Sequence, residues 1–141
     1  MNPATSGTNL EERHGCSVCK FCDIIQNGTE AHMRHGSVVL FPDAYPVSPG
    51  HHVVAPIRHV VDFFDMSEKE THDLWEALHR LRAELLREDP KIDGFNVGTN
   101  CGIAAGQTIL HAHVHLIPRR FGDTSNPRGG VRGVIPEQQS Y

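Results

Sequence analysis

Three histidines near the C-terminal end of the chain occupy every second position. They are His111, His113 and His115, within a segment, 109–118, that we predict to be a β-strand. A period of two places all three imidazoles on one face and the aliphatic residues between them in the core. A solvent-facing polar stripe would more often mix Thr, Lys, Glu and Ser, so three histidines in register indicate a chemical site.

The spacing of these histidines argues against one metal ion held by all three. Residues i and i+4 of a strand lie roughly 13 Å apart, whereas a Zn–N bond is about 2 Å long. Histidines two residues apart could share an ion, but His111 and His115 can hardly do so. We therefore expect the three imidazoles to have different functions.

The cysteines form a second cluster of chemical interest. Cys16, Cys19 and Cys22 lie close together, and only Cys101 lies elsewhere. The N-terminus has no apolar leader, so the expected compartment is the cytoplasm. There, such clustering favours metal binding or redox chemistry over disulfides. A Cys-x-x-Cys pair is half of a zinc site, and the alternative is a set of buried thiols.

The pattern of apolar residues and turn residues predicts the strands and the helix that must position these residues. Strands are predicted at 37–41, 51–56, 94–100 and 109–118. Ser67 and Glu70 form a capping box that predicts a helix beginning there. The helix carries one apolar stripe, made by Leu74, Leu78, Leu81 and Leu85.

Composition limits the class of protein. The 141 residues fit one domain, which we place at 16–141 after a mobile tail at 1–15. A net charge of −4 disfavours a general nucleic-acid binder. The apolar runs are too short to span a membrane. The last 20 residues are rich in Gly, Pro and Arg, which predicts a loop or an extended arm.

Several sequence blocks, taken together, resemble the histidine triad (HIT) family. His111 to Ile117 meet the motif His-φ-His-φ-His-φ-φ in full. The blocks CKFCDII, FPDAYPVSPGH, HHVVAPIRH and FNVGTNCGIAAGQTILH match in family order, and RRFGDTSNPRGG is similar to bacterial-type HIT hydrolases. The resemblance implies an α+β fold, with an antiparallel sheet and helices packed on one side. It also implies a homodimer.

The resemblance assigns the chemistry to the middle histidine. His113 would attack the α-phosphate of a nucleotide and form a nucleotidyl-histidine, which water hydrolyses. His115 and His51 would flank the phosphate as donors. Gln107 and Thr108 would contact it through side chains and backbone, although an ordinary turn before the strand is the alternative.

Further residues match positions that bind the nucleoside in this family. Asn100 is expected near the phosphate or ribose, and Asp43 on the ribose hydroxyls, whose protons a carboxylate can accept. The alternative for Asp43 is a turn-forming residue. Phe41 and Phe21 are candidates for the base pocket, or simply core aromatics.

Some family members bind structural zinc, and the resemblance assigns its ligands here. CKFC supplies Cys19 and Cys22 but not Cys16. The partners by family position are His59 and His111. This set would close a tetrahedral site, so the zinc would be structural, and no organic cofactor is implied.

The function implied is a nucleotide hydrolase or nucleotidyl transferase. Its candidate substrates are dinucleoside polyphosphates, nucleoside phosphoramidates and adenylylated groups. The alternative is a zinc protein that binds or senses nucleotides without turnover. A uridylyltransferase-type enzyme would have Gln where His115 stands. Four arginines are predicted either to reach a polyphosphate or to belong to a solvated or dimer-contacting arm: Arg119, Arg120, Arg128 and Arg132.

Overall fold

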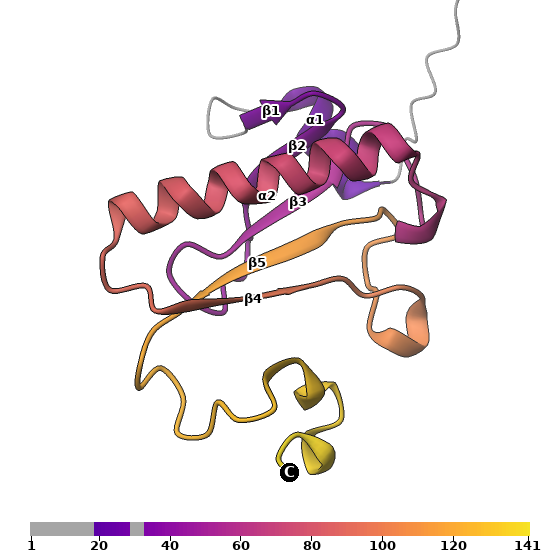
Figure 1. Ribbon diagram of the computed structural model, residues 1–141. Coiled ribbons are helices and arrows are strands. Elements are labelled where there is room, and N and C mark those ends of the chain that lie inside the picture. The colour runs from indigo at the N-terminus through magenta and orange to yellow at the C-terminus, as the bar shows by residue number, and fades with distance from the viewer. Residues whose placement is uncertain (1–18, 29–32) are drawn as a thin grey trace, which may run out of the picture.

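The computed structural model describes residues 19–28 and 33–141; the tail predicted at 1–15 and Cys16 lie outside them. A five-stranded antiparallel sheet in the order β1-β2-β3-β5-β4 forms the centre (Figure 1). The strands are Met33–His35 (β1), Val38–Pro42 (β2), His52–Pro56 (β3), Gly94–Gly98 (β4) and Val114–Arg119 (β5). The α-helices are Lys20–Asn27 (α1) and Glu68–Glu88 (α2). The predicted α+β class is confirmed.

Helix α2 begins at the predicted capping box and covers one face of the sheet. The Ser67 hydroxyl accepts the Glu70 N–H at 3.2 Å, and the Glu70 carboxylate accepts the Ser67 N–H at 2.8 Å. The leucine stripe is buried, as predicted. It packs against alternate residues of β2, β3 and β5, namely Val38, Leu40, Val54, Val114 and Leu116.

Helix α1 packs against the opposite face, so the two helices do not share one side as the resemblance implied. Phe21, Cys22 and Ile25 are buried against Val39 and other residues of β2 and β3. The cause is visible in β2, where every residue from Val38 to Phe41 is buried. A continuous apolar run of this kind is typical of a strand that is covered on both faces.

The last strand is shorter than predicted. It begins at Val114 rather than at residue 109. The reason is that the preceding backbone is bonded elsewhere: His111 N donates to Ile109 O at 2.8 Å, and Ala112 N donates to Val60 O at 2.6 Å. The predicted alternation nevertheless holds, because Ala112, Val114 and Leu116 are all buried.

The C-terminal arm, residues 126–141, forms a small lobe beside β4 (Figure 1). It contains two 3₁₀ turns, Gly130–Val134 and Pro136–Gln138. Within the part of the chain that the structure describes, no helix is both long and apolar enough to cross a membrane.

Candidate active site

Most of the predicted site residues meet at one pocket of about 480 Å³. That volume is in the range of small-molecule sites. We call it the histidine pocket. Of the residues predicted from sequence, it is lined by Phe21, Phe41, Asp43, Asn100, Thr108, His113 and His115.

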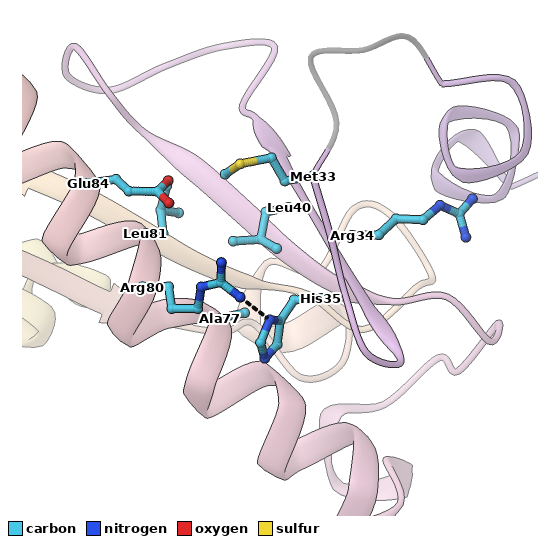
Figure 2. Close-up of a pocket in the computed structure, with 8 residues that line it drawn as sticks. All are labelled: Met33, Arg34, His35, Leu40, Ala77, Arg80, Leu81 and Glu84. Carbon is cyan, nitrogen blue, oxygen red and sulfur yellow. Dashed lines mark hydrogen bonds between the residues drawn. The ribbon is translucent and has the colours of Figure 1, made fainter.

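A second hollow, between β1 and α2, is too small for a substrate (Figure 2). Its volume is about 50 Å³, which holds at most a few water molecules. Arg80 closes it by donating to His35 Nδ1 at 3.1 Å. The histidine pocket is therefore the better candidate of the two.

The ring of His113 is fixed in one tautomer. Its Nδ1 lies 2.7 Å from the carbonyl oxygen of His111. A carbonyl can only accept, so Nδ1 carries a proton, and Nε2 is the nitrogen that has the lone pair when the imidazole is neutral. The side chain is buried, and the Phe21 ring packs against it at a centroid distance of 5.0 Å. Such a nitrogen is a competent nucleophile.

His51 and His115 form a hydrogen-bonded chain that starts at a backbone amide. The Val47 N–H donates to His51 Nδ1 at 3.1 Å. This nitrogen must then be unprotonated, so His51 carries its proton on Nε2. That proton is donated to His115 Nδ1 at 2.9 Å. His115 consequently presents an Nε2–H donor, beside a His113 ring at 5.0 Å.

Burial keeps both rings neutral. It lowers the pKa of His115 to about 4, and the neighbouring His113 and His51 add to that effect. Burial also lowers the pKa of His51, although the nearby Asp43 carboxylate opposes it. At neutral pH these two histidines therefore offer oriented N–H dipoles rather than positive charges.

Asp43 closes a turn, which was one alternative from the sequence, and it also lies in the histidine pocket. Its Oδ1 accepts the Tyr45 N–H at 2.8 Å and so closes a turn. Its Oδ2 lies 3.6 Å from His51 Nε2 and from His115 Nδ1. The carboxylate is thus part of the histidine pocket, and its contact with a ribose stays a prediction.

The predicted metal ligands come together at the N-terminal end of α1. They are Cys19, Cys22, His59 and His111. Their ligand atoms all lie within 4.8 Å of one another. His111 Nδ1 lies 3.5 and 3.7 Å from the two sulfurs, and His59 Nδ1 lies 3.3 Å from Cys22 Sγ. A tetrahedral zinc would set such S–N edges at about 3.6 Å.

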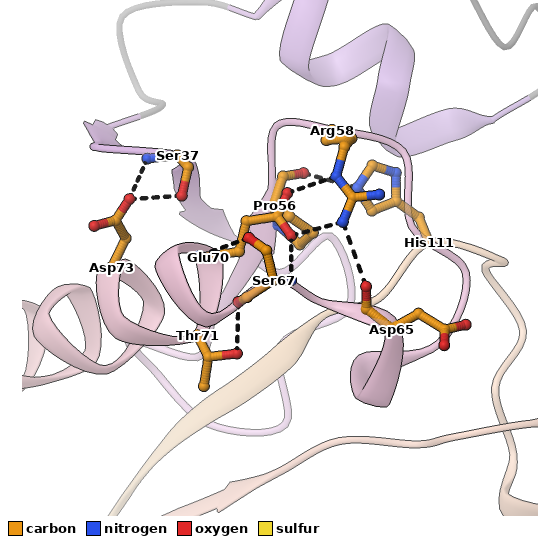
Figure 3. A network of polar contacts seen from close by, with 9 residues as sticks. All are labelled: Ser37, Pro56, Arg58, Asp65, Ser67, Glu70, Thr71, Asp73 and His111. Carbon is orange, nitrogen blue, oxygen red and sulfur yellow. Dashed lines mark hydrogen bonds and ion pairs between the residues drawn. The ribbon is translucent and has the colours of Figure 1, made fainter.

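The tautomer of His111 also suits a metal. Its Nε2 donates to Pro56 O at 2.8 Å (Figure 3), which leaves Nδ1 unprotonated toward the two sulfurs. A ligating histidine is typically held in this way by a carbonyl. His111 itself is completely buried. The donor set and its spacing therefore fit a closed metal site.

Comparisons with known proteins agree with this arrangement. The HIT domain family matches residues 25–122, which is most of the chain. The chain belongs to the HIT family. An uncharacterised HIT-like protein of Mycoplasma genitalium is 34% identical over 110 residues, covering 77% of each chain.

Two further HIT relatives carry more specific descriptions. An AP-4-A phosphorylase of Mycobacterium tuberculosis is 37% identical over 96 residues, 66% of this chain and 48% of that protein. This chain thus spans about half the length of the phosphorylase. A zinc-bound histidine triad family protein of Mycobacterium smegmatis has a TM-score of 0.68 at 32% identity, over 78% of this chain and 81% of that one.

Gln107 lies differently from the expectation set by the HIT resemblance. Its side chain is buried and does not line the histidine pocket. Its Oε1 accepts the Gly102 N–H at 2.8 Å, and its Nε2 donates to Val61 O at 2.7 Å. The amide therefore braces the loop before the histidines, and only the loop that it holds can contact a phosphate.

The contacts of the four arginines also differ from those that the polyphosphate prediction required. Arg119 pairs with Asp123 at 2.7 Å, and Arg120 pairs with Asp89 at 2.6 Å. Arg128 and Arg132 lie over the Tyr141 ring, at 4.7 and 5.3 Å from its centroid. All four arginines are engaged within the chain, and none of them lines the histidine pocket.

The sequence analysis missed several groups at this site. Lys20 and Tyr45 line the histidine pocket, with Lys20 Nζ 5.7 Å from the Tyr45 ring centroid. The Val47 amide and the Pro56 carbonyl set histidine tautomers. These last two are backbone groups, so no residue type in the sequence could have signalled them.

Proposed function

We propose that this HIT-family protein is a nucleotide hydrolase or nucleotidyl transferase that acts on the α-phosphate of its substrate through His113. The observation that carries the proposal is the pair of tautomers at the histidine pocket. The bond from His113 Nδ1 to a carbonyl directs the lone pair of the neutral ring to Nε2, and the adjacent His115 has an Nε2–H donor. A nucleophile and an oriented donor are what phosphoryl chemistry requires.

In the first step, the His113 Nε2–P bond forms as the bond from phosphorus to the leaving group breaks. Negative charge grows on the phosphoryl oxygens, and the His115 N–H, Thr108 and Asn100 line the pocket where that charge develops. In the second step, the oxygen of a water molecule bonds to phosphorus, the P–N bond to His113 breaks, and the proton lost by that water passes to solvent.

The nucleoside would occupy the apolar end of the same pocket. The Phe21 and Phe41 rings meet edge to face at 5.1 Å, and Ile24 lies beside them. Aromatic walls of this kind suit a planar base. Asp43 would accept the ribose hydroxyls. The name of the phosphorylase relative supports a nucleotide substrate but does not choose the base.

The site formed by Cys19, Cys22, His59 and His111 would hold a structural zinc ion. The tetrahedral spacing and the name of the zinc-bound relative support this assignment. The zinc would fix the position of His111, whose carbonyl orients His113. The implied homodimer and cytoplasmic location stay predictions.

The test is to replace the nucleophile and look for its adduct. His113→Ala should lower turnover of adenosine 5′-phosphoramidate by several orders of magnitude while nucleotide binding persists. Mass spectrometry of acid-free quenched wild-type protein should locate a nucleotidyl group on His113. His79→Ala, on the exposed side of α2, is the matched control.

Near-normal turnover in His113→Ala, or an adduct on another residue, would overturn the mechanism. Tight nucleotide binding with no turnover by the wild type would instead favour the non-catalytic sensor.

A further inference from the structure

One end of the histidine pocket has mostly apolar walls. Phe21 and Phe41 meet there edge to face, and Ile24 of α1 lies beside them. The Phe21 ring also lies 5.0 Å from the His113 ring, so these walls begin next to the proposed nucleophile. The remaining apolar lining of the pocket consists of Pro42, Ala44, Val53 and Ile109. A planar base fits such walls, but its polar edge still needs a hydrogen-bond partner.

Lys20 brings a cation to this apolar end. It is the first residue of α1, directly before Phe21 and four residues before Ile24. Residues four apart lie on the same face of a helix, and Lys20 and Ile24 both line the histidine pocket. Of the described residues that line this pocket, Lys20 is the only lysine or arginine. The polar edge of a bound base would therefore meet an ammonium group.

The ammonium of Lys20 is accessible to a ligand. The side chain is exposed, and its contact within the described ranges is with the Tyr45 ring, whose centroid lies 5.7 Å from Nζ. Lys69, at the start of α2, is by contrast paired with the Asp73 carboxylate at 2.7 Å. A cation–π contact at an exposed site is weak. The three N–H donors of Lys20 can therefore turn to acceptors on a bound base.

The purine bases differ in what they offer to such a donor. Guanine presents its O6 and N7 acceptors side by side, and a lysine can donate to both. Adenine carries an amino group in place of O6, so a lysine would reach N7 only and would face a second donor. A phosphate on the ribose could also attract an ammonium. However, the Asp43 carboxylate, which lines the same pocket, would repel that phosphate.

We propose that Lys20 makes the histidine pocket selective for 6-oxopurine nucleotides, with its ammonium donating to O6 and N7 of guanine or hypoxanthine. This inference rests on the proposed function, which places the nucleoside at the apolar end of the pocket. Lys20 is a specificity residue and takes no part in the bond changes at phosphorus. Its interaction with the base is the same in the ground state and in the transition state, so it acts on KM rather than on kcat.

The test compares nucleotides that differ only in the base. In isothermal titration calorimetry of the wild type, GMP and IMP should bind about tenfold more tightly than AMP, because only the first two present O6. The 5′-monophosphate of 2-aminopurine riboside has the amino group of guanine but no O6, and it should bind like AMP. The value of kcat/KM for guanosine 5′-phosphoramidate should exceed that for the adenosine compound by a similar factor, with the difference in KM.

Three variants then ask whether Lys20 is responsible. Lys20→Met keeps an unbranched side chain but removes the ammonium, and it should bring the ratio of GMP affinity to AMP affinity to about one. Lys20→Arg retains a donor that can bind O6 and N7 together, and it should retain most of the preference. Lys91→Met removes the same charge from an exposed residue outside the pocket and should leave the ratio unchanged.

The two hypotheses fail differently. Equal affinities for GMP and AMP in the wild type would overturn the base selectivity while turnover through His113 stands. A preference that survives in Lys20→Met would do the same, even if both nucleotides bind more weakly, because the ammonium would then act on the phosphate charge. Turnover that persists in His113→Ala would overturn the proposed function, whereas the nucleotide affinities do not depend on that reaction.

Discussion

At the residue scale, the proposed chemistry depends on where three imidazole protons lie. A backbone group sets the first two: the His111 carbonyl for His113 and the Val47 amide for His51. The His51 side chain in turn sets that of His115. Both nitrogens of His51 already have partners, so we expect it to act as a positioning residue rather than as a direct phosphate donor. This differs from the role that the family resemblance assigned to it.

Replacing His51 should disturb the tautomer of His115. In His51→Phe, His115 Nδ1 loses its donor, so its proton can move from Nε2 to Nδ1. We expect kcat to fall at least tenfold, as when an orienting partner is lost. ¹⁵N–¹H correlation spectra of the imidazoles should show Nε2–H for His115 in the wild type and a tautomer mixture in the variant.

His72→Phe, at an exposed position of α2, is the control and should change neither observable. An unchanged His115 tautomer in His51→Phe would contradict the hydrogen-bonded chain, whatever the effect on rate.

Most residues of the candidate site could be named from the sequence, but their hydrogen-bond roles could not. The alternation of histidines predicted a shared face, and the structure brings His113 and His115 together at one pocket. Gln107 was expected on the phosphate because its position in the sequence matches the HIT resemblance. Its true partners, such as Val61 O, lie far along the chain. Pairings of this kind depend on the folded backbone rather than on local pattern.

At the scale of elements, the Cys/His site joins α1 to the loop after β3 and to the segment before β5. Cys22→Ser should therefore lower both zinc content and Tm, since a structural zinc contributes directly to folding. Elemental analysis should give about one zinc per wild-type chain and much less in the variant. Cys101→Ser, outside the cluster, should retain the metal.

A wild-type protein that lacks zinc after expression in zinc-replete medium would contradict this assignment. So would full zinc occupancy in Cys22→Ser.

Glu70 stabilises the first turn of helix α2. The buried carboxylate accepts from the Ser67 N–H, and Arg58 donates to it through Nε at 2.9 Å and a terminal nitrogen at 2.8 Å (Figure 3). Glu70→Ala should lower the free energy of unfolding by about 2 kcal/mol, because the cap and a charge-assisted pair are both lost. Urea unfolding measures this change.

Glu68→Ala removes an exposed carboxylate from the same turn and should lower the free energy of unfolding much less. Equal losses in the two variants would mean that helix charge, rather than the cap and Arg58, stabilises this end.

The elements differ in how far local sequence determines them. The capping box and leucine stripe predicted α2, because both signals lie within the helix itself. The start of β5 was not predictable in the same way, since it depends on Ala112 donating to Val60 in a distant loop. The uninterrupted apolar run of β2 indicates that both faces of the sheet are covered.

At the scale of the whole molecule, the neutral histidines link folding to pH. An unfolded chain binds a proton on His115 near its ordinary pKa of 6.5, whereas the folded chain resists protonation until the pKa of about 4. Between these values the unfolded state binds more protons, so stability must fall as pH decreases. Stability from this residue is complete above pH 6.5 and is lost progressively toward pH 4.

The measurement is the free energy of unfolding at pH 7 and pH 5, in the wild type and in His115→Asn, which cannot titrate. Both proteins keep all four Cys/His ligands, so loss of a bound metal affects them alike when zinc is supplied in excess. The wild type should lose about 2 kcal/mol more than the variant over this interval. Parallel losses would mean that His115 is not held neutral by burial, and would remove the basis for treating it as a neutral donor at the phosphate.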